Sequence, residues 1–324
     1  MPKIFGVNLA GAEFNANVEG VLGTDYQYPG EAQYAYYASQ GIKVVRIPLL
    51  AERVQPGRWY EFDALLMHRG LYTSLDLAQK HGIMAILEPH QYGEFFGEKV
   101  SADAFDIDTV LDWWEKFTEH TTPHDAVYGY EVFCNEPHDQ PGDPDTTWKI
   151  NKVVAEAVRK RTGKAIILAT PGWQSARFSQ DNEKGIVLPN IDNYYFGYHV
   201  YGDGNSTGTY NTQFSQDVDQ ASWVPQGSSP IMVGPTTMSD RLMFGVRFAQ
   251  KYGRQIFVTE AGVPRSPDWQ PMWQDFLHTC SITPEVLGVF AWAGGPMWPA
   301  TYPLNLEPLS GVTAPQLQAM RQYI

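Results

Sequence analysis

Cysteine is scarce in this chain of 324 residues, which contains only Cys134 and Cys280. Neither residue lies in a Cys-x-x-Cys or Cys/His cluster with the spacing of metal ligands. Cys134 falls inside an apolar strand-like run and Cys280 late in a helix-like one, so we expect two inert, buried thiols rather than a disulfide. The cysteines therefore indicate no metal centre.

Long hydrophobic runs are also lacking. No stretch of about 18 apolar residues could span a membrane, and no charged region followed by an apolar segment marks a signal peptide at the N-terminus. We therefore expect no membrane partner. Because Met1–Lys3 leads directly into the first predicted strand, the chain fits a secreted domain from which an export signal has been removed, with a cytoplasmic location as the alternative.

Basic residues are outnumbered, with 23 Lys and Arg against 36 Asp and Glu, which gives a formal net charge of −13. A nucleic acid needs clustered Lys and Arg, so it is not an expected partner. Aromatic residues, in contrast, make up 14% of the chain and include 10 Trp and 18 Tyr. A neutral, ring-shaped ligand and simple core packing explain this abundance equally well.

Short apolar runs rich in β-forming residues alternate along the chain with segments of helical period. The predicted strands are Ile4–Leu9, Lys43–Leu49, Met84–Pro89, Val127–Asn135, Ala165–Thr170, Tyr194–Val200, Gln255–Thr259 and Leu287–Ala293. The predicted helices are Glu31–Gln40, Phe62–His81, Asp108–Glu119, Thr146–Thr162, Asp240–Tyr252, Trp269–Thr279 and Pro315–Tyr323. This alternation favours an α/β fold, a single (β/α)8 TIM barrel over residues 1–324, with a doubly wound open sheet as the runner-up.

Two local patterns complete the prediction. Thr313 and Gln316 have the spacing of a capping box at the start of the last helix. The polar segment Gly202–Pro235 follows the sixth strand as one long loop. Because such loops in compact domains are usually functional or disordered, we expect this one to wall a binding cleft.

Polar residues occupy the carboxyl ends of the otherwise apolar strands, where barrels of this type place their active sites. In chain order they are Arg46, His90, Asn135, Glu136, His199, Tyr201, Glu260 and Trp292. Any one of them fits a structural role, such as a satisfied core hydrogen bond. As a set they predict a site at the mouth of the barrel.

Glu136 and Glu260 are the two acids of this set, and they end the fourth and seventh predicted strands. Retaining glycoside hydrolysis uses two carboxyls about 5 Å apart, one to protonate the leaving oxygen and one to attack the anomeric carbon. Their surroundings must separate their pKa values, so that one is protonated while the other is ionised. Two unrelated carboxylates at strand ends are the alternative interpretation.

Motifs spread over nearly the whole chain point to one known pattern. Val132–His138 contains Asn135-Glu136-Pro137, and the other motifs are Gly6–Gly11, Val45–Pro48, Leu87–Tyr92, His199–Tyr201, Thr259–Gly262 and Ala291–Pro296. In this order they resemble the strand motifs of glycoside hydrolase family 5, the cellulase family. The resemblance implies a retaining, endo-β-1,4-glucanase-like hydrolase of a polysaccharide or oligosaccharide, a monomer that needs no cofactor and no metal.

Carried over by position, the resemblance implies that Glu136 is the acid/base and Glu260 the nucleophile. It also implies a set of residues that bind substrate or support the nucleophile: Arg46 beneath Glu260, Tyr201 donating to its carboxylate, Asn135 on the sugar 2-hydroxyl, His90 and His199 on other hydroxyls, Trp292 as the floor under the reacting sugar, and Trp173 as a stacking platform outside it.

The third-strand motif departs from the family's Asp-x-His-Asn, because this chain has Glu88-Pro89-His90-Gln91, which puts the role of Gln91 in doubt. After the nucleophile, Ala261 stands where many relatives carry another small or polar residue. Further aromatic residues fall in predicted mouth loops and fit either sugar platforms or packing: Trp59, Trp148, Trp223 and Trp298.

Two other clusters are not expected to bind metal. Pro123 breaks the helix that would place His120 and His124 on one face. Three aspartates, Asp139, Asp143 and Asp145, share one loop but lack the glycine and final glutamate of a calcium-binding hand.

Other functions stay open at this stage. A β-mannanase, a xyloglucanase or an exopolysaccharide hydrolase of the same family would use the same residues, as would a transglycosylase. A catalytically inactive carbohydrate-binding barrel is the alternative from another class. It is disfavoured because both carboxylates and the supporting Arg46 and Tyr201 are present.

Overall fold

A computed structural model of the chain describes residues 2–16, 20–100, 104–132, 145–179, 181–220 and 231–324. Within these residues, eight parallel strands close into a barrel. Around the barrel they follow the order β1 (Ile4–Leu9), β10 (Val286–Gly294), β9 (Ile256–Gly262), β8 (Tyr194–Tyr201), β7 (Ala165–Ala169), β6 (Val127–Val132), β3 (Met84–Pro89) and β2 (Val44–Leu49). The predicted barrel is confirmed, and the open sheet is excluded.

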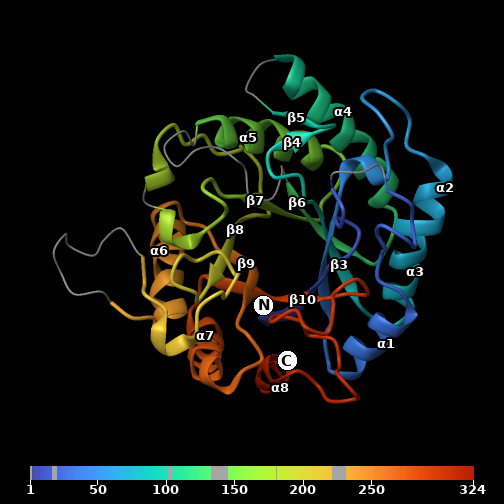
Figure 1. Cartoon of the computed structure of the whole chain (residues 1–324). Helices are drawn as coiled ribbons and strands as arrows, with labels where there is room; N and C mark the ends of the chain where they lie inside the picture. Colours follow the sequence, from blue (N-terminus) through green and yellow to red (C-terminus); the bar gives the residue numbers. More distant parts are fainter. Residues whose placement is uncertain (1, 17–19, 101–103, 133–144, 180, 221–230) are drawn as a thin grey trace.

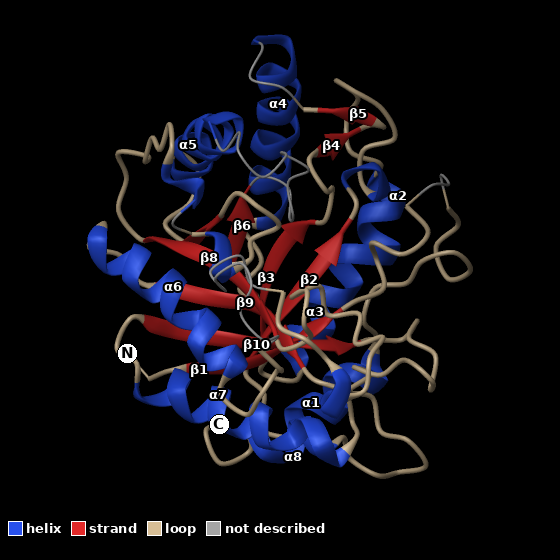
Figure 2. Cartoon of the chain, turned by 60° about the vertical axis from the view of Figure 1, so that its left-hand side comes forward, coloured by secondary structure: helices blue, strands red, loops and turns tan. Residues whose placement is uncertain are grey.

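Helices surround the ring of strands (Figure 1). They are α1 (Glu31–Ser39), α2 (Ala64–Met67), α3 (Thr73–Lys80), α4 (Ala104–Thr121), α5 (Asp145–Arg159), α6 (Thr237–Lys251), α7 (Gln270–Ile282) and α8 (Pro315–Met320). Figure 2 shows the small hairpin of β4 (Glu94–Phe95) and β5 (Glu98–Lys99) beside α4. Each predicted helix has a counterpart, because an apolar stripe faces the barrel: α7, for example, buries Met272, Trp273, Phe276, Leu277 and Cys280.

The helix predicted over Phe62–His81 is interrupted. Asp63 caps α2 by accepting hydrogen bonds from the backbone of the second and third helical residues, and a π-helical turn, η2 (His68–Tyr72), then separates α2 from α3. Gly70 lies in this turn, and a Cβ there would be 2.6 Å from the ring of Tyr28. The turn therefore fits at this place because glycine leaves room for that ring.

The capping box predicted for the last helix is wrong. The N-cap of α8 is Ala314, with no side-chain capping bond. Gln316 is buried and donates instead to the carbonyl of Val263 at 2.8 Å, while the carbonyl of Thr313 accepts from Gln318 at 2.9 Å. A long-range contact thus replaces the local one, because a buried amide needs a partner wherever the fold provides one.

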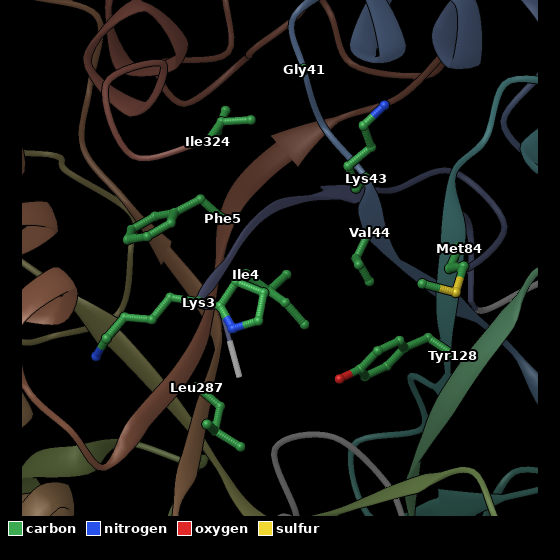
Figure 3. A pocket seen from close by; sticks show the side chains of 11 residues that line it. Lys3, Ile4, Phe5, Gly41, Lys43, Val44, Met84, Tyr128, Leu287 and Ile324 are labelled. Carbon is green, nitrogen blue, oxygen red and sulfur yellow. The ribbon is translucent and has the colours of Figure 1, made fainter.

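The amino ends of the strands form an apolar end of the barrel. A cluster of Val44, Ile86, Ile167, Phe257, Leu287 and Phe290 fills its interior. A cavity of about 400 Å³ opens below this cluster (Figure 3) and is lined by residues that include Phe5, Lys43 and Tyr128. The two termini meet nearby, since the rings of Phe5 and Tyr323 stack at 5.2 Å. None of the predicted site residues that the structure describes lines this cavity.

Cys280 is buried in α7 with a free thiol whose pKa is raised by burial, as expected for an inert residue. Cys134 lies outside the described residues. Among the helices in the described parts of the chain, none combines the length and apolar character that a membrane crossing requires.

Candidate active site

A layer of charged side chains lies above the apolar cluster, toward the carboxyl ends of the strands. Arg46 of β2, Glu88 of β3 and Glu131 of β6 each have 0% exposure, and Glu260 of β9 has 3%. Charges are rarely buried to this degree unless they are paired. This layer therefore marks the site at the barrel mouth.

Arg46 connects three carboxylates. Its Nη1 lies 2.9 Å from Glu260 Oε1, its Nε lies 2.6 Å from Glu131 Oε2, and its Nη2 lies 3.1 Å from Glu88 Oε2. Nη1 also donates to Asn8 Oδ1 at 2.8 Å. Burial works against the guanidinium charge, but Glu131, Glu88 and Glu260 together raise the pKa of Arg46 above its usual value. The predicted contact between Arg46 and Glu260 is present.

Glu260 is held by β8 as well. Tyr201 donates its hydroxyl to Glu260 Oε2 at 2.7 Å, as the resemblance implied, and His199 Nδ1 lies 3.5 Å from the same oxygen. The backbone of β9 makes this possible through a bulge: Tyr198 pairs with Val258 but His199 pairs with Glu260, so Thr259 is an extra residue. Successive side chains in a regular strand point to opposite faces, whereas the bulge lets both Thr259 and Glu260 face the interior.

His90 stands at the end of β3 between a carboxylate and two aromatic side chains. Its Nδ1 lies 3.0 Å from Glu88 Oε2, and its Nε2 lies 2.9 Å from the Tyr92 hydroxyl. Burial disfavours a charged imidazole, but the adjacent Glu88 carboxylate outweighs it and raises the pKa of His90 to about 9. The ring also stacks on Trp292, with centroids 6.0 Å apart. The Glu88 carboxylate therefore favours the charged form of the imidazole.

Trp292 is half-buried at the end of β10, where its Nε1 donates to the Tyr302 hydroxyl at 3.0 Å. Trp298 packs edge-on against Trp292 and stacks on Tyr302 at 4.0 Å. Three aromatic side chains thus form one connected group next to His90, which supplies the flat apolar surface on which a sugar ring could rest.

A cavity of about 260 Å³ lies beside Glu260 and its β8 partners. It is lined by Trp173, Ser175, Phe178, His199, Tyr201, Asn205, Ser206 and Thr207. Trp173 is 37% exposed, which leaves part of its indole open to a ligand. The last three lining residues belong to the segment Gly202–Pro235, so its described part walls a cavity at the site, as expected for a functional loop.

That loop is anchored by Arg241 of α6. The guanidinium donates to the carbonyls of Tyr201 and Asp203, at 2.5 and 2.7 Å, and to Asp219 Oδ1 at 2.9 Å. Asp203 in turn accepts from the backbone of Gly208 at 2.9 Å. Buried hydrogen bonds therefore hold the described part of the loop in place.

Several residues of this site were not singled out from the sequence. Glu131 accepts hydrogen bonds from Arg46, from Gln174 at 2.6 Å and from Thr259 at 3.0 Å. A glutamate inside an apolar run was the one signal that could have drawn attention to it. Gln91, which had no assigned role, is structural, since it accepts from the backbone of Ala51 at 2.7 Å.

Among the four further tryptophans, Trp148 does not lie in a mouth loop, and of its two interpretations packing is confirmed. It has 0% exposure, lies on the buried face of α5 and donates to the carbonyl of Asn182 at 2.8 Å. Trp59 is 47% exposed and does not line the cavity beside Glu260. Trp223 lies outside the described residues, as do the predicted site residues Asn135 and Glu136, and Asp139 and Asp143.

In the parts of the chain that the structure describes, no group of three or more His, Cys, Asp or Glu side chains is arranged to hold an ion. His120 and His124 lie at the end of α4 and beyond it, and each packs an imidazole ring against an aromatic side chain.

A closed parallel barrel with buried carboxylates, their cationic partner and aromatic side chains at one end is the architecture of a barrel glycoside hydrolase. The chain matches the family model described as Cellulase (glycosyl hydrolase family 5) over residues 5–280, and it belongs to this family.

Similar proteins agree with this assignment. The chain is 26% identical over 316 residues to a probable endo-beta-1,4-glucanase B of Aspergillus kawachii, with 95% of this chain and 86% of that protein covered. The endoglucanase Cel5A of Pseudomonas stutzeri, solved in complex with cellobiose, is 28% identical, with a TM-score of 0.83 and coverage of 99% of this chain and 92% of that one. An endo-beta-1,4-glucanase of Xanthomonas axonopodis pv. citri, 24% identical, shares the fold with a TM-score of 0.85 over 99% of this chain and 98% of that one.

Proposed function

We propose that this glycoside hydrolase is a retaining endo-β-1,4-glucanase, with Glu260 as nucleophile and Glu136 as acid/base. The observation that carries the proposal is the surrounding of Glu260, a buried carboxylate that Arg46 and Tyr201 hold at 2.9 and 2.7 Å. The positive charge and the donated hydroxyl both favour an anionic, oriented carboxylate.

In the first step, Glu260 attacks the anomeric carbon while the bond to the leaving oxygen breaks and Glu136 supplies the proton for that oxygen. In the second step, Glu136 takes a proton from water, the water oxygen attacks the same carbon, and the bond to Glu260 breaks. Each step inverts the anomeric configuration, so the product retains it. No cofactor takes part.

The other predicted residues bind the sugar in this proposal. Trp292 is the floor beneath the reacting ring, and His90, which stacks on it, binds a hydroxyl by exchanging its Nε2 contact with Tyr92 for the sugar. His199 binds another hydroxyl and Asn135 the 2-hydroxyl, whose interaction strengthens in the transition state. Trp173 stacks a further ring in the adjoining cavity. An unbranched chain of β-1,4-linked glucose has flat CH faces that suit such aromatic surfaces.

The relatives support the proposed substrate class. Those at 26 to 28% identity include proteins named endo-beta-1,4-glucanase and an endoglucanase solved with cellobiose. A polymeric glucan cannot enter a cell, so we place the activity outside the cell.

Product analysis tests this function directly. We expect oligosaccharides of mixed length from carboxymethyl-cellulose and mixed-linkage glucan, with far less product from glucomannan and xyloglucan. Inertness on the whole panel together with retained binding would instead indicate a carbohydrate-binding module.

The catalytic assignment is tested with Glu260→Ala on an aryl β-cellobioside. We expect turnover to fall by a factor of about 10⁴ or more, and azide to restore it by forming the α-glycosyl azide in place of the missing carboxylate. Glu119→Ala, which removes an exposed carboxylate on α4, is the matched control and should behave like the wild type. A β-configured azide product, or no rescue, would contradict Glu260 as the nucleophile.

A further inference from the structure

Glu131 is a buried carboxylate that no step of this mechanism uses. It lies on β6 with 0% exposure, and its oxygens accept three hydrogen bonds: from Arg46 Nε at 2.6 Å, from Gln174 Nε2 at 2.6 Å and from Thr259 Oγ1 at 3.0 Å. Burial opposes its ionisation, but the charge of Arg46, helped by His199 and the Gln174 amide, holds the pKa of Glu131 below its ordinary value. Glu131 is therefore an anion beneath the site.

This anion competes with Glu260 for the same cation. Arg46 carries one positive charge and pairs with Glu131, Glu88 and Glu260 at 2.6, 3.1 and 2.9 Å. Among the three, Glu131 makes the shortest contact and attracts the guanidinium most strongly. Charges interact strongly over these distances in a buried site. Glu131 and Glu88 therefore compensate much of the positive charge of Arg46, and Glu260 interacts with the remainder.

Glu131 also joins the segments that frame the site. Its partner Thr259 immediately precedes Glu260 in the bulge of β9. Its partner Gln174 follows Trp173, and the Gln174 carbonyl accepts from the backbone N–H of His199 at 2.7 Å. The carboxylate has room only because β8 carries a glycine there: a Cβ on Gly197 would lie 2.8 Å from Glu131 Oε1.

We propose that Glu131 is a positioning residue that shares Arg46 with Glu260, and so limits the positive charge offered to the nucleophile while fixing the orientation of the guanidinium. A nucleophile paired with a fully uncompensated arginine would be a more stable anion and a weaker base. The inference rests on the proposed function, because it takes Glu260 as the nucleophile.

Other charged or titratable groups surround the Glu260 carboxylate, and a test of the inference must leave them unchanged. In the described part of the chain they are Arg46 on β2, Glu88 and His90 on β3, His199 and Tyr201 on β8, and Tyr302 after β10. A substitution confined to Glu131 leaves all of them in place, so a change in the pH dependence is attributable to its charge.

The test compares Glu131→Gln, which keeps the shape and removes the charge, with Glu131→Asp, which keeps the charge and shortens the reach. The readout is the rate of covalent inactivation by 2-deoxy-2-fluoro-β-cellobiosyl fluoride as a function of pH, with the labelled peptide identified by mass spectrometry. For Glu131→Gln we expect the acid limb of the pH–rate profile to move toward lower pH by about one unit and the maximal rate of inactivation to fall about tenfold. For Glu131→Asp we expect a lower rate with the limb of the wild type.

The inference would be overturned if folded Glu131→Gln had the same acid limb as the wild type, because a purely structural residue changes stability and not the pH profile. An equal shift of the limb in both variants would also overturn it. If Glu131→Gln does not fold, Glu131→Asp decides: a wild-type rate or a displaced limb in that variant overturns the positioning role. Wild-type enzyme labelled elsewhere than at Glu260 would contradict the proposed function instead, so the two failures are distinguishable.

Discussion

Arg46 and Glu260 are 214 positions apart in the chain, yet their side chains meet at 2.9 Å inside the barrel. Both are almost completely buried, and Arg46 pairs with two more carboxylates. Removing one partner of a buried ion pair leaves uncompensated charge in a poorly solvated place, which costs far more than the loss of a surface pair. The most sensitive part of this molecule is therefore the charged layer.

Arg46→Lys should not be tolerated as a conservative change. A single ammonium cannot reproduce the contacts that the planar guanidinium makes with three carboxylates. We expect a loss of about 3–5 kcal/mol in the free energy of unfolding and activity lowered by at least about 10³-fold. Urea unfolding and turnover of an aryl β-cellobioside measure both.

The control for that substitution is Arg58→Lys, because Arg58 pairs at 2.7 Å with Glu98, which is 68% exposed. Exposed pairs contribute less than about 1 kcal/mol, so this variant should be close to the wild type. Equal effects of the two substitutions would show that the charged layer is not special.

Tyr201→Phe removes the hydroxyl that donates to Glu260 at 2.7 Å and leaves the ring in place. A hydrogen bond to a charged group contributes about 2 kcal/mol, so we expect kcat/KM to fall about 30-fold. The acid limb of the pH profile should move to higher pH, because the anion loses a donor. Tyr34→Phe removes a buried hydroxyl that contacts Ser74 far from the site, and should change stability without changing the profile.

Trp173→Ala separates binding from chemistry. The indole is 37% exposed in the cavity beside Glu260, so its loss should cost little stability. Loss of one stacked sugar ring corresponds to about 1–2 kcal/mol, which we expect as a roughly tenfold higher KM for long cello-oligosaccharides and a smaller change for short aryl substrates. Tyr60→Ala removes a side chain that is 64% exposed and lines no part of this cavity, and serves as the comparison. An equal change for short and long substrates would argue against stacking outside the reacting subsite.

Gly197→Ala tests the close approach around Glu131. The new methyl group would lie 2.8 Å from Glu131 Oε1 and 2.9 Å from Ile167 Cγ2, so we expect a loss of about 1–3 kcal/mol on thermal unfolding. Gly163→Ala is the matched control, because a Cβ there meets no atom within 4 Å. A neutral effect of Gly197→Ala would show that β8 can move away from Glu131.

The buried carboxyl group of Glu13 should make the free energy of unfolding depend on pH. Burial raises the pKa of this carboxyl from 4.5 to about 7, against opposition from the charge of His90. A carboxyl with a raised pKa in the folded state holds its proton more tightly there than in the unfolded chain. Its contribution to stability is therefore present below pH 4.5 and is lost as the pH rises to about 7.

Glu13→Gln should remove this loss while keeping an acceptor for the N–H of Gly11, which lies 2.7 Å from the carboxylate. We expect the variant to exceed the wild type by at most about 3 kcal/mol at pH 8, with no advantage at pH 4. Urea unfolding at the two pH values measures the difference, and a constant offset between the proteins would contradict the assignment.

The sequence alone determined the barrel and the positions of its polar strand ends. Eight apolar runs separated by amphipathic helices predict parallel strands and favour a closed barrel over an open sheet, and Arg46, His90, His199, Tyr201, Glu260 and Trp292 fall at the ends of those strands. The hydrophobic periodicity of a segment depends only on neighbouring residues, so it can be recognised without knowing the fold. Trp148 was left between sugar platform and packing, because its burial depends on contacts that exist only in the folded chain.

Only the tertiary structure decided how the charges are shared. Nothing in the run that contains Glu131 indicates that it binds Arg46, Gln174 and Thr259, which come from three other elements. The bulge at Thr259, which lets two successive side chains face the interior, depends equally on the pairing of β9 with β8. Buried polar groups take whichever partners the closed barrel brings within reach, and the strength of each pairing depends on the exclusion of water, which exists only once the chain has folded.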